Sequence, residues 1–146
     1  MKATFCAVAG SIGSGVAYLL GGWTHSLKFL VILMVIDFVT GLMVGGVFHK
    51  STKTETGALE SRAGFKGICK KVTMLFFVMI GHGVDVELGV DYIKTAVCIA
   101  FMVNEIISIT ENAGLMGVSV PEPITNAIDL LSKKSKLEKI DKEDEE

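Results

Sequence analysis

The chain has few of the residues that mark disulfide-rich, metal-binding or catalytic proteins. Its 146 residues include only three cysteines, three histidines and two prolines. Cys6, Cys69 and Cys98 are odd in number, far apart and outside any CxxC motif, so they predict reduced thiols and no zinc site. Nothing in the sequence resembles a nucleophile beside its base. We therefore expect no catalytic residue, no cofactor and no bound metal.

Signals for nucleotides, nucleic acids and secretion are also missing. The glycines between Gly10 and Gly15 are not followed by the Gly-Lys-Ser/Thr of a phosphate-binding loop. The net charge is −2 and the basic residues are not interleaved with aromatic ones, so nucleic acid is not an expected partner. Cleavage of a signal peptide after Ala9 is disfavoured because the apolar run before it is too short.

Hydrophobic residues, by contrast, make up 50% of the chain and gather in long runs. This pattern is typical of an integral membrane protein. We predict an all-α fold with three to four transmembrane helices, four being favoured. The expected domains are a helical transmembrane domain over residues 1–120 and an amphipathic, charged cytoplasmic tail over residues 121–146. The expected spans are residues 3–22, 27–48, 72–90 and 92–110, with a cytoplasmic basic loop at 49–71.

Two of these spans carry a carboxylate within their apolar sequence, Asp37 in one and Glu105 in the other. An ionisable group at membrane depth costs about 2.5–3.5 kcal/mol on insertion scales. Such a group therefore faces a partner, the interior of a helix bundle or water. Both residues are candidates for a functional site.

Ordered stripes of small and polar residues accompany the carboxylates. Glycine and alanine recur at four-residue intervals, which lets membrane helices pack closely. The helix-packing candidates are Ala9, Gly13, Ala17, Gly21, Gly41, Gly45, Ala96 and Ala100. The candidates for a polar or pore-lining face are Asp37, Asn104, Glu105, Ser108, Glu111 and Asn112. In a membrane these polar groups must meet protein or water, because lipid cannot satisfy amides and carboxylates.

The distribution of charge predicts the topology. Basic residues dominate the loop at 49–71 and the start of the tail, whereas the turn near residues 85–91 is acidic. The positive-inside rule then places the loop and tail in the cytoplasm and the acidic turn outside. The result is four crossings with both termini cytoplasmic, or three crossings if residues 3–22 do not span.

Four motifs in order resemble a known family. They are Ile36-Asp-Phe-Val-Thr-Gly41, Gly64-Phe-Lys-Gly67 with Lys70-Lys71, Asn104-Glu-Ile-Ile-Ser-Ile-Thr-Glu-Asn112 and Val120-Pro121. From Leu20 to Pro121 the chain resembles the holins of Gram-positive bacteriophages, a family that also includes clostridial toxin-secretion holins. The resemblance implies a multi-pass protein of the bacterial cytoplasmic (inner) membrane that forms homo-oligomers. It also implies lesions through which an endolysin, in host cell lysis, or a large toxin leaves, with an antiholin as a further partner.

Two roles for the carboxylates remain open at this stage. In one, the Asp37, Gly41 and Gly45 face packs against the Asn104, Glu105 and Ser108 face, and at high density both repack between subunits around a water-filled hole. In the other, the carboxylates only hold helices together through hydrogen bonds. The alternative function is a small transporter or ion-channel subunit in which the same carboxylates bind a proton or cation.

Overall fold

The computed structural model describes residues 2–130, without the side chains of residues 2, 3, 5, 9 and 12. Its regular elements are helices α1 (Lys2–Leu19), α2 (His25–Gly46), α3 (Ser61–Leu88) and α4 (Ile93–Leu115), with a further helical stretch at residues 122–130. No strand occurs among the described residues, which confirms the all-α prediction for that part of the chain. The predicted tail beyond residue 130 lies outside the described residues.

Two helices, α2 and α4, are long and apolar enough to cross a membrane. Their 22 and 23 residues correspond to roughly 33–35 Å at 1.5 Å per residue, slightly more than a hydrocarbon core of about 30 Å. In α1 only Cys6–Leu19 forms an apolar stretch. α3 is longer, with 28 residues, and carries charged side chains in its first and last turns.

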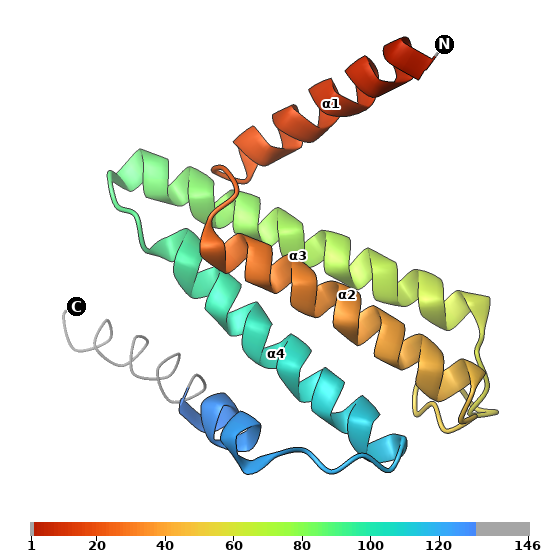
Figure 1. Cartoon of the computed structure of the whole chain (residues 1–146). Coiled ribbons are helices and arrows are strands. Elements are labelled where there is room, and N and C mark those ends of the chain that lie inside the picture. The colour runs from red at the N-terminus through yellow and green to blue at the C-terminus, as the bar shows by residue number, and fades with distance from the viewer. Residues whose placement is uncertain (1, 131–146) are drawn as a thin grey trace.

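Helices α2, α3 and α4 form a bundle in which α3 runs opposite to the other two (Figure 1). α4 packs extensively against α2 and also against α3, whereas α2 and α3 touch at few points. The buried core therefore centres on α4 and the faces turned toward it. Its members are Leu20, Leu27, Leu30, Leu33, Met34, Met74, Val78, Cys98 and Met102.

The sequence sets where these helices begin and end. The Thr24 hydroxyl accepts a hydrogen bond from the Leu27 N–H and caps α2, a role that threonine performs well. α3 ends at Gly89, whose φ of 66° is the left-handed conformation that glycine adopts without steric cost. Asp85, in the last turn of α3, accepts hydrogen bonds from the N–H groups of Ile93 and Lys94 at 2.9 Å each. These bonds satisfy two donors in the first turn of α4, which would otherwise be unpaired.

The boundary predicted for the basic loop was wrong at its carboxyl end. The sequence interpretation placed loop at residues 49–71, but α3 already begins at Ser61. Its early basic residues Arg62, Lys66 and Lys70 recur every four residues and share one exposed face, so they are compatible with a helix. The irregular segment is thus confined to residues 47–60, where the Thr54 hydroxyl donates to the Ala58 carbonyl at 2.9 Å.

Helix α1 splays away from the bundle (Figure 1). Its described side chains before Ala17 are exposed, and a Cβ built on Gly13 would meet nothing within 4 Å. The predicted stripe Ala9, Gly13, Ala17 and Gly21 does not continue to its last member, because α1 ends at Leu19 and Gly21 lies in the following turn. Gly21 has a φ of 69°, and a Cβ there would lie 2.5 Å from the His82 ring.

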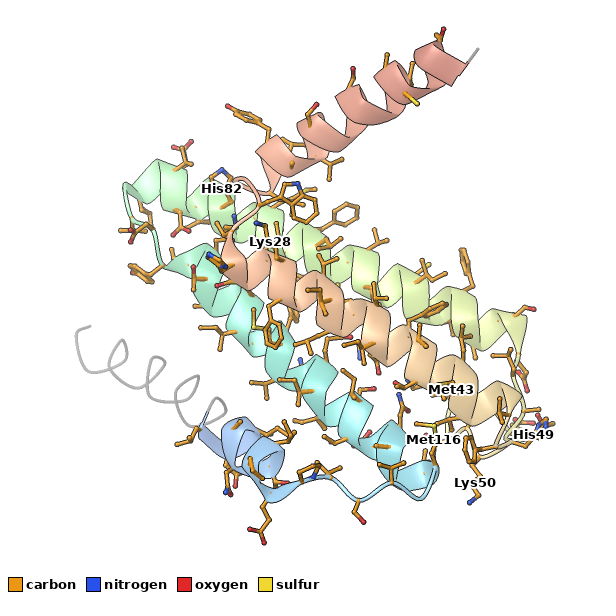
Figure 2. The ribbon with its side chains drawn as sticks, in the orientation of Figure 1. Lys28, Met43, His49, Lys50, His82 and Met116 are labelled. Atoms are coloured by element: carbon orange, nitrogen blue, oxygen red, sulfur yellow. The ribbon has the colours of Figure 1, made fainter. Side chains whose placement is uncertain are left out.

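Large apolar side chains remain exposed over the outer faces of the bundle. Phe29, Ile32 and Val35 on α2 and Phe76 and Ile80 on α3 are each about half exposed. An apolar surface of this extent is what a helix facing lipid presents. His82 and Lys28 mark one end of the bundle, and His49 and Lys50 mark the opposite end (Figure 2).

Candidate functional site

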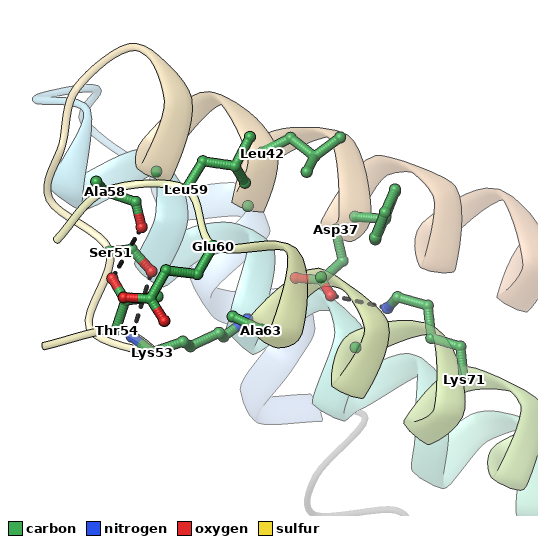
Figure 3. A pocket seen from close by; sticks show the side chains of 15 residues that line it. Asp37, Leu42, Ser51, Lys53, Thr54, Ala58, Leu59, Glu60, Ala63 and Lys71 are labelled. Atoms are coloured by element: carbon green, nitrogen blue, oxygen red, sulfur yellow. Dashed lines mark hydrogen bonds and ion pairs between the residues drawn. The ribbon is translucent and has the colours of Figure 1, made fainter. Parts of the chain in front are cut away.

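One lysine joins the three helices of the bundle through their acidic side chains. The Lys71 ammonium, on α3, lies 2.7 Å from Asp37 Oδ2 on α2 and forms a second ion pair with Glu105 Oε2 on α4. Figure 3 shows the Lys71–Asp37 pair beside the carboxyl-terminal half of α2. The exposed fraction of the side chain is 15% for Lys71, 10% for Asp37 and 5% for Glu105. The three charges are therefore largely withdrawn from solvent.

The antiparallel run of α3 makes this meeting possible. Asp37 lies beyond the midpoint of α2 and Glu105 near the midpoint of α4, while Lys71 lies before the midpoint of α3. Because α3 runs opposite to its neighbours, these positions fall at one level of the bundle. Two carboxylates against one ammonium give the cluster a formal charge of −1. Burial of ionised groups is costly unless each one is paired and hydrogen-bonded, and here each carboxylate has a cationic partner.

Asn112 extends this cluster toward the end of α4. Its amide Nδ2 lies 3.3 Å from Asp37 Oδ1 and 3.0 Å from the Thr40 hydroxyl oxygen, and donates toward both. The Thr40 hydroxyl in turn donates to the Asp37 carbonyl at 3.1 Å. A Cβ on Gly41 would lie 3.9 Å from the same amide, which shows how closely α2 approaches Asn112. We call Asp37, Lys71, Glu105 and Asn112 the charged network.

The structure brings together only part of the predicted polar face. Asp37, Glu105 and Asn112 are buried, and Ser108 is half-buried beside them. Asn104 and Glu111 are exposed, and Asn104 also borders the space between α3 and α4. The outward side of α4 therefore keeps polar groups that are free to meet another molecule.

The small-residue candidates also divide between the interior and the surface. Gly41 faces α4 as predicted, but Gly45 packs against the loop, where a Cβ would lie 3.3 Å from Leu59 Cα. Ala96 is half-buried and Ala100 is exposed. The α2–α4 contact therefore combines the apolar core with Gly41 and the network, and it does not follow the full length of the predicted stripes.

Sequence reasoning missed Lys71, because it placed this residue at the end of a solvated loop. A signal was present: two carboxylates in apolar spans require a cation, and Lys71 directly precedes the apolar run that starts at Val72. The interaction at the other end of the bundle was missed as well. There the buried Lys94 donates to the carbonyls of Gly21 and Gly22 at 2.9 and 3.2 Å.

Several cavities border the charged network. One of about 240 Å³ lies between α3 and α4. It is lined by Asp37, Lys53, Ala63, Lys66, Gly67, Lys70, Lys71, Asn104, Glu105 and Ser108. A smaller one of about 70 Å³ lies between α2, the loop and the start of α3 (Figure 3). Within residues 2–130 no group of three or more His, Cys, Asp or Glu side chains is arranged to hold a metal ion.

Comparison with known proteins adds an independent finding. The sequence profile of the bacteriophage holin family matches residues 14–133. An uncharacterized protein of Halalkalibacterium halodurans is 40% identical, covering 84% of this chain and 90% of its own length. One of Listeria innocua is 38% identical, covering 84% and 83%. A more distant relative in Bacillus phage phi105, 28% identical over 79% of each chain, is named a probable holin. No solved structure matches the chain.

Proposed function

Because the chain belongs to the bacteriophage holin family, we propose that it oligomerises in the bacterial cytoplasmic membrane and opens lesions that release an endolysin or a large toxin. The observation that supports this best is the charged network. It joins three helices through a single lysine, and a neighbouring subunit can supply replacements for these polar contacts. The lipid bilayer and further copies of the chain are its direct partners.

The proposed closed state is the bundle with its network intact. Lys71 occupies both carboxylates inside one subunit, while Asn104, Glu111 and Ala100 remain exposed on α4. As subunits crowd together, these outward groups pack against neighbours. The bundles then separate, and the carboxylates turn toward a water-filled hole. Contacts between subunits remove these polar side chains from lipid, which favours assembly. The number of such contacts increases with subunit density.

We propose that α2, α3 and α4 each cross the membrane and that α1 provides the first of four crossings. The loop at residues 47–60 and the first turns of α3 are rich in lysine and arginine, whereas Glu87 and Asp91 lie at the other end of the bundle. This polarity favours a cytoplasmic loop with both termini inside. The transmembrane domain would cover residues 1–120, followed by a charged cytoplasmic tail. α1 reaches its membrane position by closing the splayed angle at Gly21 and Gly22.

Topology is tested by labelling single cysteines with a membrane-impermeant maleimide in whole cells. The background is a variant with Cys6, Cys69 and Cys98 replaced by serine. We expect Glu87→Cys to react from outside, and Thr4→Cys and Glu55→Cys to react only after permeabilisation. Reaction of Thr4→Cys from outside would establish three crossings and contradict the fourth. Reaction of Glu55→Cys from outside would contradict the orientation.

Function is tested by inducing the chain in bacteria that also produce a cytoplasmic endolysin without an export signal. We expect abrupt lysis that requires both proteins, preceded by entry of a dye that intact membranes exclude. Release of reporter proteins of increasing size then measures the lesion and separates endolysin-sized from toxin-sized cargo. Cells that survive with a graded, ion-selective conductance would contradict the holin proposal and favour a small channel or transporter.

A further inference from the structure

The larger cavity beside the charged network has a cationic rim. Four of its lining residues are lysines, and two of its lining residues are carboxylates. Lys71 is already paired with both carboxylates. The other lysines, Lys53, Lys66 and Lys70, are exposed and form no ion pair with any residue between 2 and 130. With four lysines and two carboxylates, the lining as a whole carries a formal charge of +2.

The wall that α2 and α4 contribute to the same cavity has a different chemistry. It consists of the Asn104 amide, the Ser108 hydroxyl and the carboxylates of Asp37 and Glu105. Each carboxylate oxygen accepts more than one hydrogen bond, so the ion pairs with Lys71 leave acceptor capacity toward the cavity. A ligand that fits both parts has an anionic group for the rim and neutral hydroxyl donors for the wall.

The depth of the cavity favours a ligand from the membrane. From Asp37 to the end of α2 at Gly46 the helix rises roughly 14 Å at 1.5 Å per residue, so the wall lies well inside the bilayer if α2 spans it. Lys66 and Lys70 lie between that level and the loop end of the bundle. Their amino groups extend toward the level of lipid phosphates, where long basic side chains of membrane helices come to rest.

We infer that this cavity binds the headgroup of an anionic phospholipid that carries free hydroxyls, as in phosphatidylglycerol. The phosphodiester lies among Lys53, Lys66 and Lys70. The headgroup folds inward from the phosphodiester into the cavity, so that its glycerol hydroxyls donate to the wall, where Glu105 and Ser108 accept. This binding site goes beyond lesion formation, since a lipid can occupy it whether or not subunits assemble. The experiment that tests it therefore measures lipid retention rather than lysis.

The experiment is native mass spectrometry of the purified full-length chain in detergent, with lipids supplied one at a time. Wild type is compared with the double variant Lys66→Gln/Lys70→Gln. A matched double variant, Lys28→Gln/Lys50→Gln, removes the same charge from exposed lysines that do not line the cavity (Figure 2). We expect the cavity variant to retain about thirtyfold less phosphatidylglycerol, since each lysine near an anionic lipid contributes about fivefold. The matched variant should retain the wild-type amount.

Selectivity separates the lipid from simpler anions. We expect phosphatidylglycerol to bind more tightly than phosphatidic acid, which lacks the hydroxyls, and Ser108→Ala to reduce that preference several-fold. Equal losses in both lysine double variants would overturn the inference, because bulk attraction would then explain binding. Equal retention of the two lipids would overturn the role of the wall. Displacement of phosphatidylglycerol by millimolar inorganic phosphate would assign the cavity to free phosphate and overturn the lipid assignment.

Discussion

The ammonium of Lys71 lies 2.7 Å from the carboxylate of Asp37 and thereby ties α3 to α2, two helices that otherwise touch little. The same ammonium pairs with Glu105, so α4 joins the contact. Apolar packing accounts well for the association of α4 with each neighbour. The register of α2 against α3, by contrast, rests mainly on this ion pair.

Removal of Lys71 should therefore destabilise the bundle. Lys71→Gln leaves two buried carboxylates without a cation, and breaking a buried ion pair costs about 3–5 kcal/mol. We expect a loss of this order in the free energy of unfolding, measured by far-ultraviolet circular dichroism during titration of mixed micelles with sodium dodecyl sulfate. Lys50→Gln is the control, because the Lys50 side chain is exposed and lies outside the charged network and the larger cavity. Equal stability of the two variants would contradict the structural role of Lys71.

Substitution of the two carboxylates distinguishes between the two roles that the sequence leaves open for them. Glu105→Gln and Asp37→Asn each leave one carboxylate for Lys71, so both variants should fold, with a neutral network. If carboxylates line the open hole, each change should alter the ion conductance of the lesion. Current recordings of the purified protein in planar bilayers at low salt, where surface charge is screened least, measure this. An unchanged conductance in both variants would limit Asp37 and Glu105 to holding the helices together.

Gly81 is predicted to be intolerant of any side chain. A Cβ there would lie 3.2 Å from Lys94 Cα, so α3 and α4 would have to move apart. Gly83, on the same helix, meets nothing within 4 Å and serves as the matched position. Gly83→Ala should gain up to about 1 kcal/mol through helix propensity, whereas Gly81→Ala should lose that gain to overpacking of about 1–3 kcal/mol. The same detergent titration compares them, and equal effects would show that α3 and α4 are not this close.

Asp85 should protect the first backbone amides of α4 from hydrogen exchange. It accepts hydrogen bonds from the N–H groups of Ile93 and Lys94, and loss of such a cap costs about 0.5–2 kcal/mol. Asp85→Ala should therefore speed amide hydrogen exchange in the first turn of α4 by up to about thirtyfold, since 1.4 kcal/mol corresponds to tenfold. Glu87→Ala, at an exposed position, provides the reference. Unchanged exchange at Ile93 and Lys94 in Asp85→Ala would contradict the cap.

Gly41 offers a test of the contact between α2 and α4. A methyl group there would reach the Asn112 amide at an ordinary van der Waals distance of 3.9 Å, so Gly41→Ala should behave as wild type. Gly41→Leu would push Asn112 away from Asp37 and should bring dye entry forward after induction. Identical timing of dye entry in the leucine variant and wild type would show that this contact does not restrain lesion formation.

Residue type and spacing were enough to predict the helical fold and to single out Asp37 and Glu105, but they left open whether these carboxylates face a partner, the bundle interior or water. The spacing of Asp37 and Gly41 also placed both on the face that meets α4. The spacing of residues along one helix does not predict how neighbouring helices are aligned along the bundle. That alignment places Lys71 beside Asp37 and Glu105. The start of α3 was missed because Arg62, Lys66 and Lys70 were judged by charge alone, although their four-residue interval fits an exposed helical face.

The contacts made by the turns between helices were also not predictable from the sequence. Gly21 continued the four-residue pattern of α1, yet it adopts a left-handed φ of 69° beyond the helix end and packs against His82. Asp85 was assigned to an acidic turn, and Lys94 to the expected span at residues 92–110. Their actual partners, the first amides of α4 and the carbonyls of Gly21 and Gly22, depend on how the three helix ends converge.

The most direct test of the proposed holin mechanism is the amount of protein per membrane area at which dye entry begins, compared between Lys71→Gln and wild type. Quantitative immunoblotting of membranes sampled through induction gives that amount, and Lys50→Gln, at an exposed position outside the cavity, controls for the loss of a positive charge. If the charged network restrains lesion formation, Lys71→Gln will admit dye at a lower density than both other proteins. Dye entry at the same or a higher density would contradict the account.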